Sequence, residues 1–247
     1  MLGLPAHVRA CLFDLDGVLT QTAKVHAAAW KRAFDEFLHK RAADRGGDFV
    51  AFDAVGDYDE YVDGKPREDG VRSFLASRGI ELPEGEPQDA PDAGTVHGLG
   101  NHKNEIVLRM IREDGVQPYE GSVRYVHAVR DAGVPRAVVS SSANAHAVLQ
   151  AAGIEDLFDA VVDGVQAERE HLHGKPAPDT FLAGARALGI EPAAAAVFED
   201  ALAGVAAGRA GDFGYVVGVD RVGQAQALRD HGADVVVGDL DELLRAP

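Results

Sequence analysis

The chain has 247 residues, of which 46% are hydrophobic, enough for one large domain or for a core with a smaller module. Its 24 basic and 40 acidic residues give a net charge of −16, which argues against nucleic acid or an anionic membrane surface as a partner. The single cysteine, Cys11, excludes an internal disulfide and any site built from several cysteines. Because no apolar run is long enough to span a membrane and no signal segment is recognised, we expect a cytoplasmic protein.

The first predicted strand is an apolar run that ends in two acidic residues. It covers residues 8–13 and is followed by Asp14, Asp16 and Gly17. Side chains two positions apart in a strand point the same way, so both carboxylates can address one site. Asp and Gly are also common turn residues, and on its own this stretch fits a plain turn equally well.

The segment after this strand shows helical patterns and no convincing strand. We expect helices over residues 23–39, 67–78 and 101–114, with a Pro-rich, acidic loop at 83–100. The distance to the next predicted strand, at residue 134, is far longer than the roughly 30 residues of a βαβ unit. The sequence therefore predicts a helical module inserted directly after the first strand.

Strands and helices alternate in the second half of the chain. The predicted strands cover residues 134–139, 160–162, 195–198, 215–219 and 234–237. The predicted helices cover residues 122–132, 143–152, 178–188, 202–208 and 223–231, with a loop at 163–177. This alternation predicts an α/β fold whose parallel sheet is covered by helices on both faces.

Polar residues follow three other strands or stand in the loops after them. They are Ser140, Ser141, Ser142, Asn144, Lys175, Glu199 and Asp200. Each has an ordinary explanation when it is taken alone: Ser142 can cap a helix, and Lys175 can be a solvated loop residue. Together with Asp14 and Asp16, however, they supply ligands for one divalent cation and donors for one phosphoryl group. The combined set favours metal-assisted phosphoryl transfer over the plain turn.

Four motifs carry a resemblance to a known family. FDLDGVLT, VVSSS, GKPAPDTF and VFEDALAG, in this order, resemble the signature motifs of the haloacid dehalogenase superfamily of phosphotransferases. The resemblance implies a Rossmann-like core at residues 1–24 and 117–247, and an α-helical cap at residues 25–116. An acid at position 16 argues against the dehalogenase branch, whose leaving group does not need protonation.

The same resemblance implies roles for the strand-end residues. Asp14 would be the nucleophile that forms an aspartyl-phosphate, and Asp16 the general acid/base. Mg²⁺ would be bound by Asp14, Asp200, Glu199 and the backbone carbonyl of Asp16. The phosphoryl oxygens would be bound by Lys175 and by the serine cluster with its asparagine.

Within the superfamily the chain is most similar to the β-phosphoglucomutase-like subfamily, through its cap. The residues concerned are His26, Trp30, Gly64, Arg67, Lys103 and Asn104. In that subfamily a histidine at the position of His26 couples cap closure to the acid/base, although a structural hydrogen bond is an alternative role. Arg67, in DGKPREDGVRSFL, matches the arginine that binds the distal phosphate, and Lys103 with Asn104 matches a pair that reaches the same ligand. Trp30 fits packing better than ligand contact.

The resemblance implies a Mg²⁺-dependent mutase that interconverts β-D-glucose 1-phosphate and glucose 6-phosphate through a 1,6-bisphosphate. We expect a monomer whose partner is a small sugar phosphate. One alternative is a phosphatase of the same superfamily that hydrolyses small sugar phosphates with water as the acceptor. The other is a catalytically silent sugar-phosphate-binding protein, which the intact pair Asp14 and Asp16 argues against.

Overall fold

The computed structural model describes residues 2–46 and 48–245 and divides into two compact units. The core unit comprises residues 1–22 and 116–247, and the cap unit comprises residues 23–115. These bounds differ slightly from the expected division at residues 24 and 116. Within the described ranges, no helix has both the length and the apolar character needed to cross a membrane.

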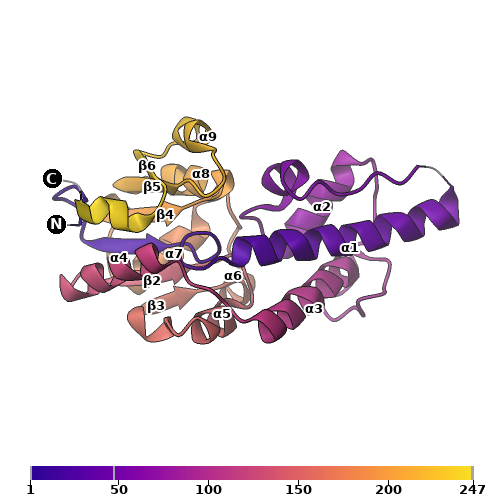
Figure 1. Cartoon of the computed structure of the whole chain (residues 1–247), viewed down its shortest axis with the longest axis horizontal. Coiled ribbons are helices and arrows are strands. Elements are labelled where there is room, and N and C mark those ends of the chain that lie inside the picture. Colours follow the sequence, from indigo (N-terminus) through magenta and orange to yellow (C-terminus); the bar gives the residue numbers. More distant parts are fainter. Residues whose placement is uncertain (1, 47, 246–247) are drawn as a thin grey trace. The chain divides into compact units, whose positions relative to one another are not determined.

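The core unit is built on a sheet of six parallel strands, in the order β3-β2-β1-β4-β5-β6 (Figure 1). The strands are β1 Ala10–Phe13, β2 Arg136–Val139, β3 Ala160–Val162, β4 Ala195–Glu199, β5 Tyr215–Val219 and β6 Val235–Val237. This arrangement confirms the predicted α/β fold. The first strand of the chain lies in the middle of the sheet, so the residues that follow β1 are flanked by those that follow β2 and β4.

Helices connect these strands. They are α4 Glu120–Asp131, α5 Ala145–Ala151, α6 Gly164–Arg169, α7 Asp179–Ala187, α8 Leu202–Ala210 and α9 Ala225–Asp230, with the 3₁₀ turns η2 Glu155–Leu157 and η3 Pro192–Ala194. A further 3₁₀ helix, η4 Leu240–Arg245, follows the last strand. The prediction of a plain loop at residues 163–177 was wrong, because α6 lies within it. Asp163 caps α6 by accepting a hydrogen bond from the backbone N–H of Gln166 at 2.8 Å.

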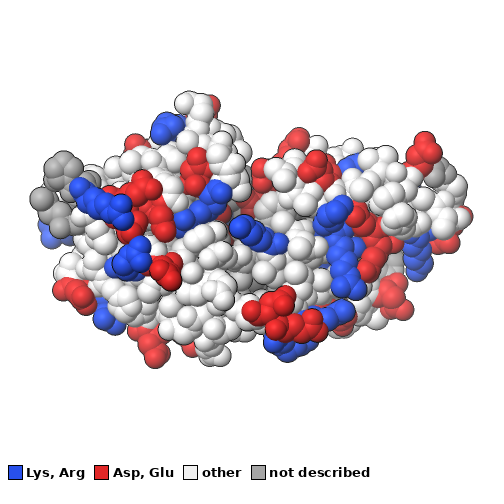
Figure 2. All heavy atoms as spheres, in the orientation of Figure 1, with Lys and Arg blue, Asp and Glu red and all other residues white. Residues whose placement is uncertain are grey.

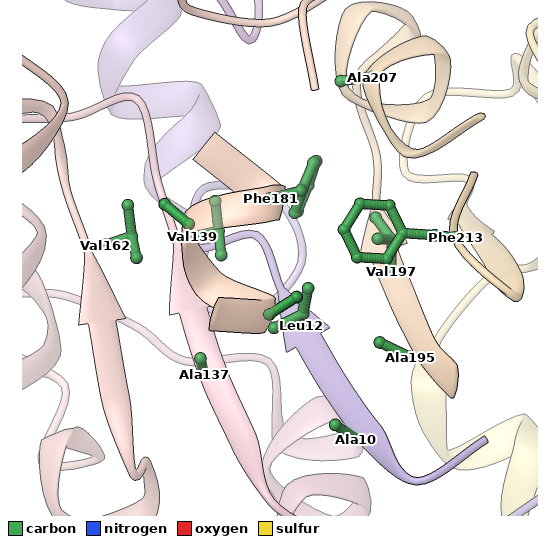
Figure 3. Packing of buried hydrophobic residues seen from close by; sticks show 12 residues of the cluster. Ala10, Leu12, Ala137, Val139, Val162, Phe181, Ala195, Val197, Ala207 and Phe213 are labelled. Atoms are coloured by element: carbon green, nitrogen blue, oxygen red, sulfur yellow. The ribbon is translucent and has the colours of Figure 1, made fainter. Parts of the chain in front are cut away.

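Both faces of the sheet are buried, which explains why its strands are apolar throughout rather than alternating. On one face, Leu12, Val139, Val162 and Val197 from four neighbouring strands pack with Phe181 of α7 (Figure 3). On the other face, Phe13 stacks on Phe198 at 4.4 Å between ring centroids, and Tyr125 of α4 packs against both rings. The sheet is therefore a rigid platform for whatever follows its strand ends.

The cap unit is helical, as predicted. It contains α1 Thr22–Arg45 apart from its first residue, the π-helical turn η1 Tyr58–Val62, α2 Arg67–Ser77 and α3 Val96–Asp114. Aromatic rings form its core: Phe34 of α1 contacts Trp30, Phe52 and Phe74 at centroid distances of 4.8, 5.2 and 4.2 Å. Helix α1 runs six residues beyond the predicted end at residue 39, to the residue before Gly46, whose φ of 71° ends the helix.

Helix α3 begins at Val96 instead of the predicted residue 101. Thr95 is its N-cap and accepts a hydrogen bond from the N–H of Gly98 at 3.0 Å. Gly98 and Gly100, in the first two turns, weaken the helical signal in the sequence, and the cap compensates for them. On the face drawn in Figure 2, basic and acidic side chains are interspersed over both units rather than gathered by sign.

Candidate active site

The register of the sheet brings the predicted residues of the core unit together. Phe13 pairs with Val138 of β2 and with Phe198 of β4. Asp14 is therefore in register with Val139, the last residue of β2, and with Glu199, the last residue of β4. Ser140 directly follows Val139. A backbone hydrogen bond from Asp14 N–H to the carbonyl of Phe198, at 2.9 Å, fixes this register.

Lys175 lies between two buried carboxylates. Its Nζ is 2.5 Å from Asp14 Oδ1 and 2.5 Å from Glu199 Oε1, and the lysine is only 2% exposed. Its ammonium also lies 4.8 Å from the centroid of the Phe181 ring, which shields it from water. The loop that precedes α7 thus presents a fixed cation to the ends of β1 and β4.

These contacts shift the proton equilibria of the group. Burial raises the pKa of Asp14 well above its usual range, and the carboxylates of Glu199 and Asp16 add to this rise, while Lys175 opposes it. Burial alone would lower the pKa of Lys175, but the carboxylates of Asp14 and Glu199 outweigh it, so the pKa of Lys175 is raised. Lys175 is therefore a permanent cation, which is what a buried Asp14 needs in order to ionise.

Three acidic side chains form a compact cluster. Asp14, Glu199 and Asp200 each offer a carboxylate oxygen, and these oxygens lie within 4.8 Å of one another. Two glycines make room for the acids: a Cβ at Gly17, whose φ is 90°, would collide with the carboxylate of Asp200, and a Cβ at Gly204 would collide with that of Glu199. Buried carboxylate oxygens at this spacing are suited to a hard divalent cation such as Mg²⁺.

Asp16 is held by two threonines that the sequence reasoning did not single out. Its carboxylate accepts a hydrogen bond from the hydroxyl of Thr22, and the Thr22 and Thr20 hydroxyls are 2.6 Å apart. Both threonines are buried, so they orient a half-buried carboxylate from its inner side. The LTQT run, which begins three residues after Asp16, was the available signal, since hydroxyls two residues apart can form such a chain.

Arg221 was also missed. It is far from Gly17 in the sequence, but it contacts the backbone of the turn that follows Asp16. Its Nε donates to the carbonyl of Gly17 at 2.8 Å and one Nη donates to the carbonyl of Gly238 at 2.7 Å, while its guanidinium carbon lies 3.5 Å from the centroid of the Tyr119 ring. Because these partners are far apart in the sequence, no local pattern indicates the role.

The serine cluster forms a tight turn between β2 and α5. Ser140 is buried and its hydroxyl oxygen accepts from the N–H of Ser142 at 3.1 Å, and Ser142 accepts in turn from the N–H of Asn144 at 3.1 Å. Ser141 and Asn144 are half-buried. The start of α6 packs against this turn, because the N–H of Gly164 donates to the carbonyl of Ser142 at 3.1 Å. The turn is thus supported on both sides. Ser142 is not the helix cap considered as its ordinary role, because the N-cap of α5 is Asn144 and the bond from Asn144 N–H to Ser142 lies in the turn before the helix.

In the cap unit, three of the predicted residues are in contact. Lys103 of α3 is 5% exposed, and its Nζ lies 3.0 Å from His26 Nδ1 and 4.8 Å from the centroid of the Trp30 ring. Trp30 itself is buried and stacks on Phe34.

The other cap residues lie near α2 and α3. Arg67, half-buried at the start of α2, donates through Nε to Glu68 Oε1 at 2.9 Å and packs against Gly100 of α3. Gly64, with a φ of 70°, forms the turn before α2, where a side chain would be strained. Asn104, next to the buried Lys103, is half-buried. Glu68 was not singled out from the sequence, although it directly follows Arg67.

Known proteins resemble this chain over nearly its whole length. The haloacid dehalogenase-like hydrolase family matches residues 8–212. A β-phosphoglucomutase from Mycobacterium bovis is 59% identical over 247 residues, covering 99% of this chain and 94% of that protein. A fructose-1-phosphate phosphatase from Escherichia coli is 32% identical over 202 residues, covering 81% of this chain and 90% of that protein.

Solved structures agree with these relatives. The crystal structure of a β-phosphoglucomutase from Clostridium difficile has a TM-score of 0.75 at 26% identity, and the match covers 96% of this chain and 93% of that one. The chain therefore belongs to the haloacid dehalogenase superfamily, in its β-phosphoglucomutase-like subfamily, and is an enzyme of the phosphotransferase and isomerase type.

Proposed function

We propose that this enzyme interconverts β-D-glucose 1-phosphate and glucose 6-phosphate, with Asp14 as the residue that carries the phosphoryl group. The observation that carries the proposal is the 59% identity, over 99% of the chain, to a protein named β-phosphoglucomutase. The buried arrangement of Asp14, Lys175 and Glu199 supports it, because Lys175 places a cation beside a carboxylate whose burial otherwise favours its protonated form.

The proposed reaction is two phosphoryl transfers through one intermediate. The 6-hydroxyl of the sugar attacks phosphorus on phosphorylated Asp14, and the bond between phosphorus and the Asp14 oxygen breaks as Asp16 takes the hydroxyl proton. The resulting 1,6-bisphosphate reorients. Asp14 then attacks the phosphorus at C1, and Asp16 returns the proton to the C1 oxygen that leaves. The hydrogen bond from Thr22 to Asp16 supports this role, since it orients the carboxylate.

Mg²⁺ is the proposed cofactor, and the acidic cluster fits it. Asp14, Glu199 and Asp200, with the backbone carbonyl of Asp16, would hold the ion. Bound there, the ion would offset the repulsion between an anionic carboxylate and an anionic phosphoryl group. The transferring phosphoryl oxygens would be bound by Lys175 and by the Ser140–Ser142 turn with Asn144.

The cap residues are proposed to bind the phosphate that is not reacting. Arg67 would take the distal phosphate, because a guanidinium fork matches two phosphate oxygens. Lys103 and Asn104 would contact the same ligand, with Gly64 and Trp30 shaping their surroundings. His26 would couple cap closure to the acid/base. Its contact with Lys103 at 3.0 Å joins it to a residue proposed to bind the ligand. Closure would keep water from the aspartyl-phosphate.

A sugar-phosphate phosphatase is the second candidate, favoured by the 32% identity to a fructose-1-phosphate phosphatase. The two are separated by measuring two products from β-glucose 1-phosphate, with Mg²⁺ and a trace of glucose 1,6-bisphosphate. Glucose 6-phosphate is followed through a coupled dehydrogenase, and inorganic phosphate is followed in parallel. The mutase proposal expects glucose 6-phosphate in large excess. Phosphate release without glucose 6-phosphate would refute it, and no turnover of either kind would favour a silent binder.

A further inference from the structure

The segment between α2 and α3 is longer than two packed helices require. It runs from residue 78 to residue 95, whereas helix–helix connections commonly have about 2–8 residues. It is nevertheless firmly held. Asn101 Nδ2 donates to the carbonyls of Pro87 at 3.0 Å and of Asp89 at 2.9 Å, and the Thr95 hydroxyl donates to Asp89 Oδ2 at 2.6 Å. These hydrogen bonds fix the conformation of the loop, and long ordered loops are commonly functional.

That loop lines a partly open cavity in the cap unit, together with α1 and the start of α3. The cavity has a volume of about 400 Å³, which is in the range of small-molecule sites. Its apolar lining comes from all three elements and comprises Ala33, Phe37, Leu82, Pro91, Ala93 and Leu99. None of the residues proposed above to bind substrate lines it. The cavity is therefore a second site rather than an extension of the first.

The lining of the cavity carries both signs of charge, from Glu36, Asp44 and Asp92 and from Lys40 and Arg41. The sign of a preferred ligand therefore depends on which of them is unpartnered. Arg41 lines it and is half-buried, yet it makes no hydrogen bond or ion pair with any residue that the structure describes. Along α1, the acids nearest to Arg41 are Asp44, three residues further on, and Glu36, five residues before it. Glu36 is already bound by Arg32 Nε at 2.9 Å and by His102 Nε2 at 2.7 Å.

The remaining charged residues of the lining, Lys40, Asp44 and Asp92, are exposed to solvent. Water screens exposed charges, so these three contribute little selectivity for either sign of ligand. A half-buried guanidinium beside an apolar surface, by contrast, gains from an anionic partner that replaces its lost water. Arg41 is therefore the group that selects the sign of the occupant.

We propose that this cap cavity binds a small amphipathic anion, with its apolar body against Phe37 and Leu99 and its acidic group on Arg41. The acidic group would be a carboxylate, phosphate or sulfonate, since a guanidinium binds all three in the same way. The site goes beyond the proposed function, because it uses none of the catalytic or substrate-binding residues.

The test uses two dyes that share their ring systems and differ in charge. 8-Anilino-1-naphthalenesulfonate carries a sulfonate, and N-phenyl-1-naphthylamine does not. Fluorescence titration of the full chain is expected to show one saturable site that binds the sulfonate dye more tightly. Arg41→Gln is expected to weaken binding of the sulfonate dye by about tenfold, the scale of one charge-assisted contact, while binding of the neutral dye is unchanged. Phe37→Ala is expected to weaken both dyes.

The matched control is Arg109→Gln, which removes an exposed arginine of α3 that does not line the cavity and which should change neither dye. Thermal unfolding of each variant establishes that it is folded before titration. Equal binding of the sulfonate dye by wild type and Arg41→Gln would overturn the assignment of the anion contact. Unchanged binding of both dyes by Phe37→Ala would overturn the cavity as the site.

Discussion

Replacing Lys175 with methionine should destabilise the core unit strongly, because it leaves two buried carboxylates without a counter-charge. The methionine keeps most of the volume of the lysine side chain, so the change isolates the charge. At 2.5 Å and an effective dielectric constant of about 20, each ammonium–carboxylate pair attracts by roughly 7 kcal/mol, most of which is offset by the cost of desolvating the charges. Removing one partner of a buried pair costs about 3–5 kcal/mol.

Because Lys175 serves both Asp14 and Glu199, we expect a loss near the upper end of that range. For a chain of this length, about 4–5 kcal/mol corresponds to a fall in melting temperature of roughly 10–20 °C. The measurement is thermal unfolding by circular dichroism in EDTA. Arg186→Met is the matched control, since Arg186 is an exposed cation on α7, the helix that follows Lys175, and its replacement should leave the melting temperature within about 2 °C of the wild type.

A double variant sharpens the reasoning. Adding Glu199→Gln to Lys175→Met removes one of the stranded carboxylates, so the double variant should be more stable than the sum of the two single losses predicts. Mg²⁺ should raise the melting temperature of Lys175→Met more than that of the wild type, because a cation in the acidic cluster replaces the missing charge. A melting temperature of Lys175→Met close to that of Arg186→Met would refute the claim that these buried contacts stabilise the fold.

Further predictions concern single residues. Gly17→Ala should raise the Mg²⁺ concentration needed for half-maximal activity, because the added Cβ meets the carboxylate of Asp200. The control is Gly189→Ala, which has a similar backbone strain at a φ of 68° but open space around it. An equal rise in the control would contradict the reasoning. Burial raises the pKa of the Cys11 thiol, so Ellman's reagent at pH 8 should react with this thiol only when the protein unfolds. Rapid reaction of one equivalent of thiol in the native enzyme would show that β1 is accessible. Arg67→Ala should lower mutase kcat/KM by roughly 10- to 100-fold and spare hydrolysis of an aryl phosphate, which lacks a second phosphate. The control for it is Arg72→Ala, an exposed arginine of the same helix, and equal losses on both substrates would remove the distal-phosphate role.

The core could be predicted from the sequence because its signals are local. Asp14 and Asp16 directly follow an apolar strand, and parallel strands place their carboxyl ends at one edge, so the proximity of Asp14 and Glu199 followed from the pattern. Lys175 lies in a loop and was included only because the other polar residues accompany it. The family and the fold are confirmed by the relatives and the sheet order. The roles assigned to the individual site residues stay predictions, which the variants above address.

What the sequence did not reveal depends on contacts between distant residues or on compensation between neighbours. Arg221 reaches the turn at Gly17 across more than two hundred residues, and no periodicity marks such a contact. Helix α6 is short and follows Asp163 in a polar stretch that resembles a loop, since its stability comes from a cap and from packing against the serine turn. The start of α3 was placed too late because glycines hide the helix that Thr95 caps.

The central claim is that Asp14 passes a phosphoryl group between two positions of one sugar rather than to water. Phosphorus NMR of a single reaction containing β-glucose 1-phosphate, Mg²⁺ and a trace of the 1,6-bisphosphate follows every phosphorus atom at once. The account predicts that the glucose 1-phosphate signal is replaced by glucose 6-phosphate with almost no inorganic phosphate, and that Asp14→Asn abolishes the conversion. Conversion of the substrate into inorganic phosphate, or full activity of Asp14→Asn, would contradict it.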